Sequence, residues 1–250
     1  MSRLAVYTAI FGKKDALHEP LVHPPGCDFI CFTDQDFRSR TWQVVKVVPP
    51  LPDPTRSARR YKILAHEYLP EYDVSVWVDG NVVVRGDVGE LVDRYLRDVN
   101  MAVFDHARSR SMPIGSLRAE LTELLAMERA GKHQDDAALL ARQYDAYVRE
   151  GYPDTGGLLW SLALLRRHNE PDVIAAMERW WEELSRWSKR DQMSFNYVAW
   201  KTGLKFNYIP LDAFDNPYTK RLNHYLPPLQ NVRSYVIGAQ KRILRLLGIT

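Results

Sequence analysis

The chain has few cysteines and no long apolar segment. Of its 250 residues only Cys27 and Cys31 are cysteines, and a spacing of four residues along a strand holds them too far apart for a bond. This is typical of a reduced, cytoplasmic protein. No run of apolar residues reaches the length that a membrane span needs. The apolar residues after Met1 have no cleavage-type tail, so we expect a first strand there and not a signal peptide.

The chain also has no large excess of charge of either sign. The 34 Lys and Arg residues nearly balance the 31 Asp and Glu residues, for a formal net charge of +3. Because no surface helix interleaves basic and aromatic residues, we expect no nucleic-acid partner. Hydrophobic residues make up 46% of the chain, which is typical of a globular protein with a sizeable core.

Apolar runs alternate with helical patterns along most of the chain. The strands that we predict cover residues 4–10, 28–34, 42–48, 74–78 and 101–106, and the apolar run 155–165 is also strand-like. Two predicted helices begin after Asp53 and after Asp87. Four more are predicted at 115–131, 135–150, 171–187 and 190–203. The alternation predicts an α/β fold, which is a single Rossmann-like domain with a mixed, mostly parallel sheet covered on both faces. The helices over 115–150 form a helical insertion in it.

The end of the chain has a different character. We place the domain at residues 1–230 and a C-terminal basic amphipathic helix at 231–250. Such a helix suits an anionic membrane surface. Packing on the domain or on a partner is the favoured alternative.

The stretch "VWVDGNVVV" offers the first candidate site. Asp79-Gly80 between apolar runs is typical of a tight β-hairpin. Asp79 and Asn81 also follow a buried strand, at the sheet edge where α/β proteins bind ligands. Their oxygen atoms suit Mg²⁺ or Mn²⁺. The two interpretations are compatible, because a turn that binds a metal can also join two short strands. His224 is a further candidate metal ligand, although a lone histidine is often structural or exposed.

The helix after Asp53 is basic at its beginning. Arg56, Arg59 and Arg60 lie in its first turns, followed by Lys62. Positive charge there opposes the helix dipole. The cluster therefore suggests a site for a bound anion such as a diphosphate. A solvated basic face is the alternative.

Two loops add weaker candidates. His106 and Arg108 follow a strand and could bind a sugar carboxylate or a phosphate, or belong to a surface loop. Gly156 and Gly157 would let the backbone approach a ligand, or simply form a turn.

The stretch "RDQ" supplies Asp191 and Gln192. Asp191 is placed to cap the helix that follows. Alternatively, both side chains point into the site and bind sugar hydroxyls, with Asp191 as the candidate base toward an acceptor.

Taken in order, these motifs resemble a family of glycosyltransferases. The matching stretches are "YTAIFGKKD", "DFICFTD", "DPTRSARRYKIL", "YDVSVWVDGNVVV" and "RDQMSFNYV". The family was long catalogued as a domain of unknown function, and its plant members are linked to mucilage and pectic polysaccharides. The resemblance covers residues 4 to about 210 and implies the A-type fold of nucleotide-diphospho-sugar transferases.

The resemblance also implies roles for particular residues. The first two strands would hold the base and ribose, through Tyr7, Thr8, Thr33 and Asp34. Arg59 and Lys62 would lie near the diphosphate. Asp79 and Asn81 stand where related folds carry Asp-x-Asp, and "RDQ" resembles an Asp-Gln element that meets the sugar or acceptor. Asn81 departs from the acidic pattern and is a neutral, weaker ligand.

We therefore expect a metal-dependent, hexosyltransferase-like enzyme. It would move a sugar from a nucleotide-diphospho-sugar, above all a UDP-sugar, to a hydroxyl of a carbohydrate or lipid-linked acceptor, with Mn²⁺ or Mg²⁺. The setting would be polysaccharide or glycoconjugate synthesis, in the cytoplasm or at the inner membrane surface. The alternatives are a non-catalytic nucleotide-binding module and a metal-dependent phosphoesterase. Sugar, acceptor, stereochemistry and oligomeric state stay open.

Overall fold

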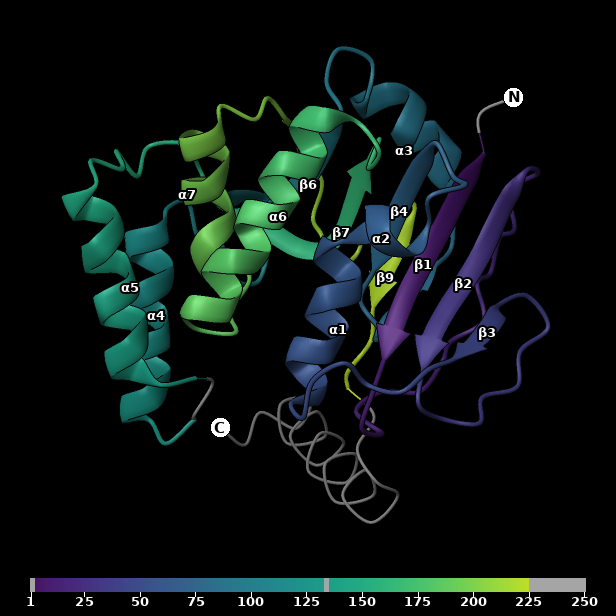
Figure 1. The fold of residues 1–250 in the computed structure, drawn as a ribbon, viewed down its shortest axis with the longest axis horizontal. Helices are drawn as coiled ribbons and strands as arrows, with labels where there is room; N and C mark the ends of the chain where they lie inside the picture. The colour runs from purple at the N-terminus through teal and green to yellow at the C-terminus, as the bar shows by residue number, and fades with distance from the viewer. Residues whose placement is uncertain (1–2, 133–134, 225–250) are drawn as a thin grey trace, which may run out of the picture.

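A seven-stranded sheet forms the centre of the computed structural model, which describes residues 3–132 and 135–224 (Figure 1). The strand order is β3-β2-β1-β4-β7-β6-β8. Strand β7 runs antiparallel to both of its neighbours and all other pairs are parallel. The strands are β1 (Leu4–Ile10), β2 (Cys27–Thr33), β3 (Gln43–Lys46), β4 (Val74–Val78), β6 (Met101–Asp105), β7 (Leu159–Arg166) and β8 (Asn207–Ile209). The predicted mixed, mostly parallel α/β sheet is thus confirmed.

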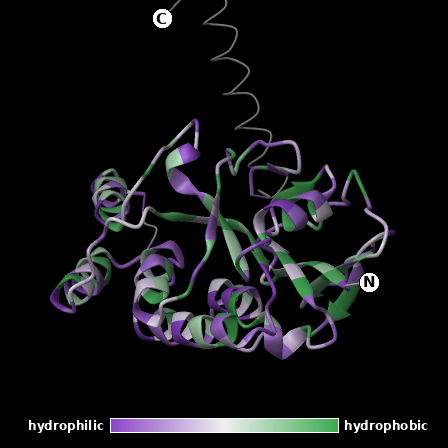
Figure 2. Cartoon of the chain, turned by 90° about the horizontal axis from the view of Figure 1, so that it is seen from above, coloured by the Kyte–Doolittle hydropathy of each residue, from purple (hydrophilic) through white to green (hydrophobic). Residues whose placement is uncertain are grey.

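Helices cover both faces of this sheet. Two buried apolar clusters lie on its opposite faces, one including residues of α1, α6 and α7 and the other residues of α3. Figure 2 shows the hydrophobic residues concentrated in the strands and on the inner sides of the helices. The helices here are α1 (Pro54–Ile63), α2 (Ala65–Tyr68), α3 (Val88–Tyr95), α6 (Pro171–Arg186) and α7 (Gln192–Thr202). No helix in the described ranges has the length and apolarity that crossing a membrane requires.

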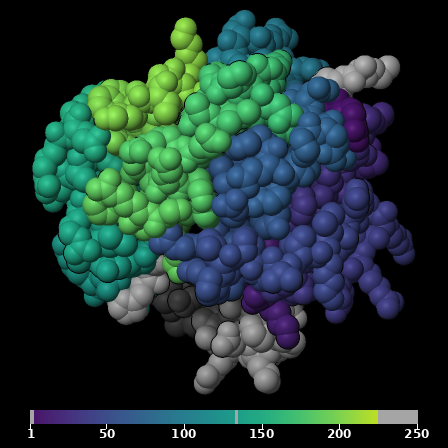
Figure 3. Space-filling model, in the orientation of Figure 1, coloured from purple at the N-terminus to yellow at the C-terminus, as the bar shows by residue number. Residues whose placement is uncertain are grey.

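The predicted helical insertion consists of α4 (Leu117–Arg129) and α5 (Ala137–Arg149). Both helices pack against α7. Figure 3 shows the insertion (teal) on one flank of α6 and α7 (green), with α1 and α2 (blue) on the other. The segment that carries Asp191 and Gln192 therefore lies between the insertion and α1. The predicted C-terminal helix over 231–250 lies outside the described residues.

A second, two-stranded sheet was not predicted. Strand β5 (Val82–Val84) pairs antiparallel with β9 (Thr219–Arg221). The backbone N–H of Val82 donates to the Asp79 carbonyl at 2.9 Å, so a turn does follow β4. It is not a β-hairpin, because β4 and β5 belong to different sheets. The β5–β9 pairing instead brings the chain up to His224 beside this turn.

Candidate active site

A cleft opens where β1 and β4 end and α1 begins. Its larger hollow has a volume of about 510 Å³, and a smaller one adjoins it beneath α1. The two hollows share the residues Lys14, Thr55, Arg59, Asp79, Asn81 and His224. We call this combined space the cleft. It lies at the carboxyl edge of the parallel strands, where ligands of α/β proteins bind.

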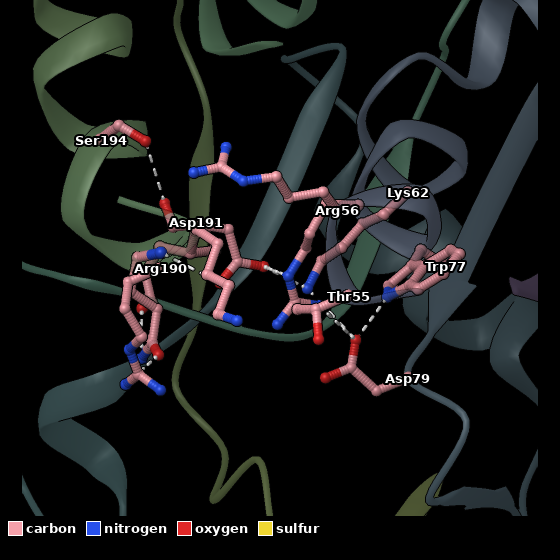
Figure 4. Close-up of polar contacts among 12 residues, drawn as sticks. Thr55, Arg56, Lys62, Trp77, Asp79, Arg190, Asp191 and Ser194 are labelled. Carbon is pink, nitrogen blue, oxygen red and sulfur yellow. Dashed lines mark hydrogen bonds and ion pairs between the residues drawn. The ribbon is translucent and has the colours of Figure 1, made fainter. Parts of the chain in front are cut away.

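Asp79 stands at the base of the cleft, directly after β4. Its Oδ1 atom accepts hydrogen bonds from Trp77 Nε1 at 2.7 Å and from Lys62 Nζ at 3.2 Å. Arg59 Nη1 lies 3.5 Å from the same oxygen. Figure 4 shows the second carboxylate oxygen turned away from these donors. One oxygen is therefore fixed by the protein while the other faces elsewhere in the cleft.

Asp191 joins the same group of charges. Lys62 is fully buried, and its Nζ donates to Asp191 Oδ2 at 2.6 Å. Arg59 Nε lies 3.1 Å from that oxygen. We call Arg59, Lys62, Asp79 and Asp191 the ion quartet. Its two cations and two anions compensate each other's charge, which is the condition for burying such groups.

The quartet also sets the proton affinity of Asp191. Burial by itself would raise the pKa of this carboxyl, but the charges of Arg59 and Lys62 outweigh burial and hold the pKa well below its usual range. A carboxylate with so low a pKa is a weak base. Its other oxygen, Oδ1, accepts from the Gln192 backbone N–H at 3.1 Å, so the predicted cap of α7 is confirmed. These contacts make Asp191 an anchor for Lys62 and Arg59.

Helix α1, which carries the basic residues, is fixed at both of its ends. Asp53 caps its first turn by accepting from the backbone N–H groups of Thr55 and Arg56, as predicted. At the other end, Tyr7 is fully buried beneath the helix and donates its hydroxyl to the Lys62 carbonyl at 3.0 Å. Tyr7 therefore supports α1 from the core, and does not line the cleft as the resemblance implies for a base-binding residue.

The residues proposed as metal ligands meet in the cleft. Asn81 makes two hydrogen bonds with Leu222. Its side-chain Nδ2 donates to the Leu222 carbonyl at 3.0 Å, and its backbone carbonyl accepts from the Leu222 backbone N–H at 2.7 Å. This use of Nδ2 leaves Oδ1 as the ligand atom. His224 Nδ1 lies 2.7 Å from Asp15 Oδ1, which leaves Nε2. A histidine oriented by a carboxylate in this way is characteristic of metal sites.

The donor set fits a hard divalent ion only if the amide takes part. No group of three or more His, Cys, Asp or Glu side chains in the described ranges could hold a metal ion. Asp79 and His224 supply one carboxylate and one imidazole, and Asn81 supplies the amide oxygen. Oxygen and imidazole ligands of this kind suit Mn²⁺ and, less well, Mg²⁺.

Of the residues predicted on the first two strands, one lines a further hollow. Asp34 lines a hollow of about 490 Å³ beyond β1 and β2, and accepts from the Gly12 backbone N–H at 3.2 Å. Thr33 is buried and donates to the Ile10 carbonyl at 2.7 Å. Thr8 is buried within β1. Of these residues, only Asp34 presents its side chain at the carboxyl edge.

Arg56 is drawn away from the cleft. Its guanidinium donates to the carbonyls of Leu184 and Trp187 at the end of α6, the second at 2.9 Å. These carbonyls have no partner within their own helix, and a cation is stabilised at the C-terminal end of a helix dipole. The contact accounts for the charge of Arg56 without an anion.

His106 and Arg108 also stay outside the cleft. His106 is buried behind Trp160, with ring centroids 3.7 Å apart. Burial lowers its pKa to about 4. Arg108 is exposed and pairs with Asp105, whose Oδ2 lies 3.6 Å from Arg108 Nε. The interpretation as a surface loop fits Arg108, while His106 belongs to the protein interior.

Gly156 and Gly157 lie at a separate hollow. Gly157 has φ +79°, and a Cβ there would come within 2.8 Å of the Tyr208 hydroxyl. That hydroxyl donates to the Gly156 carbonyl at 2.7 Å. The glycines therefore allow a tight turn against Tyr208, beside a hollow of about 360 Å³ that includes Trp200.

Several residues of the cleft were not foreseen. They are Lys14, Asp15, Thr55, Lys189, Arg190 and Arg221. Lys14 and Asp15 lie in the loop that follows β1, and this position after a buried strand is the one signal that could have pointed to them. Arg221 reaches the cleft only through the β5–β9 pairing. Its nearness to Asp79 has no local signal in the sequence.

The fold and site together define a class. A mostly parallel sheet with a cationic cleft and a carboxylate at its carboxyl edge is typical of α/β domains that bind phosphorylated ligands. The chain belongs to the TOD1/MUCI70 family, because the model of the TOD1/MUCI70 glycosyltransferase-like domain matches residues 30–224. The resemblance drawn from the sequence motifs is thereby confirmed, as is the class of glycosyltransferase-like domains.

A similar curated protein is the probable hexosyltransferase MUCI70 of Arabidopsis thaliana. It is 29% identical over 179 residues, which cover 67% of this chain and 29% of the plant protein. The matched region thus spans less than a third of that protein.

Three solved glycosyltransferases are also similar. The bifunctional glycosyltransferase WbbM has 12% identity and a TM-score of 0.46, with 84% of this chain and 39% of that chain covered. The mannosyltransferase Ktr4p of S. cerevisiae has 9% identity and a TM-score of 0.40, with 79% and 66% covered. Glycosyltransferase GlyE of Streptococcus pneumoniae TIGR4 has 9% identity and a TM-score of 0.41, with 83% and 45% covered.

Proposed function

We propose that this domain transfers a hexosyl group from a nucleotide-diphospho-sugar, a UDP-sugar in particular, to a hydroxyl of a carbohydrate or lipid-linked acceptor. The observation that carries the proposal is the assembly of a carboxylate, an amide, an imidazole and several cations in one cleft at the ends of β1 and β4. The family supports glycosyl transfer, and the printed name of the plant relative supports a hexose.

The reaction breaks the bond between the anomeric carbon and the diphosphate, whose oxygen takes the electron pair. The acceptor hydroxyl forms the new bond to that carbon, and its proton passes to the departing diphosphate or to water. Negative charge therefore develops on the leaving diphosphate, and preorganised cations stabilise it. Arg59 and Lys14 are the cations at the cleft that suit this role. Lys62 is buried, and it acts by holding Asp79 and Asp191 in place.

Asp79, Asn81 and His224 would hold Mn²⁺ or Mg²⁺. A bound divalent ion supplies further positive charge for the leaving diphosphate. The nucleoside would extend toward Asp34 along the ends of β1 and β2. Asp191, with its low pKa, is a poor base for the acceptor hydroxyl, so in this proposal it positions the quartet. The cytoplasmic location and the membrane contact through residues 231–250 stay predictions.

The two rival functions differ in how the site supports them. A two-metal phosphoesterase needs more Asp and His ligands than the described residues place together. A non-catalytic binding module has one supporting observation. Asn81 is bonded to Leu222 through both its side chain and its backbone, which would also explain it as a structural residue.

Calorimetric titration with UDP, with and without Mn²⁺, tests the proposal. We expect Asp79→Ala, or removal of Mn²⁺, to weaken UDP binding about tenfold or more. Asp105→Ala is a matched control, because Asp105 also lies at the end of a strand and both side chains are 19% exposed. UDP affinity that depends on neither Mn²⁺ nor Asp79 would favour the binding module. Absence of UDP binding would contradict the proposed function.

A further inference from the structure

The segment between α6 and α7 is held by the helical insertion at three consecutive residues. Each contact uses a polar side chain of the insertion as the acceptor. Ser188 Oγ donates to Gln143 Oε1 at 2.6 Å, Lys189 N to Asp135 Oδ2 at 2.7 Å, and Arg190 Nη2 to Glu120 Oε1 at 2.6 Å. The next two residues are Asp191 and Gln192. The insertion therefore fixes the segment immediately before Asp191 and Gln192.

The third contact continues into the cleft. Arg190 Nη2 also donates to Gln192 Oε1 at 3.0 Å. Because a guanidinium carries only donors, the Gln192 amide must turn its oxygen toward Arg190 and its NH₂ group away. On that side Nε2 lies 3.5 Å from the Leu159 carbonyl, a contact that occupies at most one of its two hydrogens. Arg190 and Gln192 both line the cleft.

Glu120 is the buried end of this chain of contacts. Its side chain is only 3% exposed, and its Oε2 lies 4.0 Å from His106 Nε2. Burial keeps His106 neutral at physiological pH. Arg190 is then the cation that compensates the Glu120 carboxylate, and the strength of such a buried pair holds the guanidinium in one orientation.

We propose that the helical insertion orients the sugar-binding group of this enzyme. Glu120 fixes Arg190, and Arg190 fixes Gln192 as a hydrogen-bond donor toward the hexose of the nucleotide-sugar. Glu120 is in this account a positioning residue, and the Gln192 NH₂ group contacts the substrate. The inference rests on the proposed function, since it assumes a nucleotide-sugar in the cleft.

Gln192→Glu separates a donor from an acceptor. The variant keeps an oxygen for Arg190 and loses the NH₂ group. We would titrate it with UDP, UDP-glucose and UDP-galactose in the presence of Mn²⁺. We expect about tenfold weaker binding of the UDP-hexose that the wild type prefers, because the hexose oxygen in contact with the Gln192 NH₂ group would lose its donor. UDP affinity should stay within about twofold, because UDP has no hexose. Unchanged UDP-hexose affinity would overturn the inference.

Glu120→Gln tests the role of the insertion. We expect UDP-hexose binding to weaken about threefold to tenfold while UDP affinity stays the same, since the neutral amide holds Arg190 less firmly. Glu123→Gln is the matched control, because Glu123 is an exposed residue of the same helix. A purely structural role for Glu120 would weaken UDP and UDP-hexose binding alike, or neither.

The double variant Glu120→Gln/Gln192→Glu decides whether one residue acts through the other. If it does, the double variant binds UDP-hexose as weakly as Gln192→Glu alone. Additive losses would overturn the inference. A wild-type protein that binds neither UDP nor a UDP-hexose would contradict the proposed function itself, and the inference with it.

Discussion

The two walls of the cleft solve different problems. The α1 wall carries Arg59 and Lys62, which pair with carboxylates at the carboxyl edge of the sheet. The wall formed by the insertion and its neighbours carries Met112, Met127 and Trp160. A charged wall suits a diphosphate. A wall with apolar and aromatic side chains suits a sugar and its acceptor. The comparison teaches that one half of the site is built from ion pairs at the edge of the sheet, and that the other combines apolar packing with the Glu120–Arg190 ion pair and the hydrogen bond to Gln192.

Breaking the charged wall should have the largest effect on stability. Lys62→Met leaves Asp191 buried with Arg59 as its remaining partner in the quartet. We expect the free energy of unfolding to fall by about 3–5 kcal/mol, measured by urea denaturation. Lys14→Met is the control at the rim of the same wall, with an expected change within about 1 kcal/mol. Equal effects of the two substitutions would show that the quartet does not stabilise the fold.

The wall formed by the insertion and its neighbours should make the free energy of unfolding depend on pH, because His106 is buried behind Trp160. His106 has a folded pKa of about 4, lowered by burial, against an ordinary value of 6.5. The unfolded chain thus binds its proton first, and stability falls as the pH drops from 6.5 to about 4, by about 3 kcal/mol in total. His168 has the same folded pKa for the same reason. We expect His106→Gln to remove about half of this histidine-dependent loss in urea unfolding series at pH 7 and pH 4.5. Parallel pH profiles for both proteins would contradict the burial of a neutral His106.

Arg56 and Arg59 sharpen the comparison with the smallest expected change. Arg56→Met should lower the free energy of unfolding by about 2 kcal/mol, because two carbonyls lose a charged donor. It should leave UDP affinity unaltered. Arg59→Met, three residues along the same helix, should weaken UDP binding in calorimetric titration. A comparable loss of UDP affinity in both variants would place Arg56 in the binding site after all.

Local patterns were sufficient for most of the fold. Long apolar runs such as 74–78 and capped helices such as the one after Asp53 carry their own periodicity and cap signals. Strands β5, β8 and β9 have three residues each, which is too short for periodicity to show. The pairing of β5 with β9 joins residues far apart in the chain, and no local signal encodes it.

The candidate site divides in the same way. Asp79 and Arg59 were predicted because each follows a recognisable feature, a buried strand or a helix N-terminus. Arg56 shares that feature, but the end of α6 packs beside it and takes its donors. Glu120 reads as an ordinary polar residue of an amphipathic helix, and only the packing of α4 on α7 buries it. Tertiary contact therefore decided what helix position alone left open.

The most direct measurement is a crystal structure of the protein with UDP and Mn²⁺. The account predicts the diphosphate beside Lys14 and Arg59, with Mn²⁺ bound by Asp79, Asn81 and His224 at the end of β4. It also predicts the nucleoside along the ends of β1 and β2, toward Asp34. A nucleotide bound away from this cleft, or a metal ion bound without Asp79, would contradict the account.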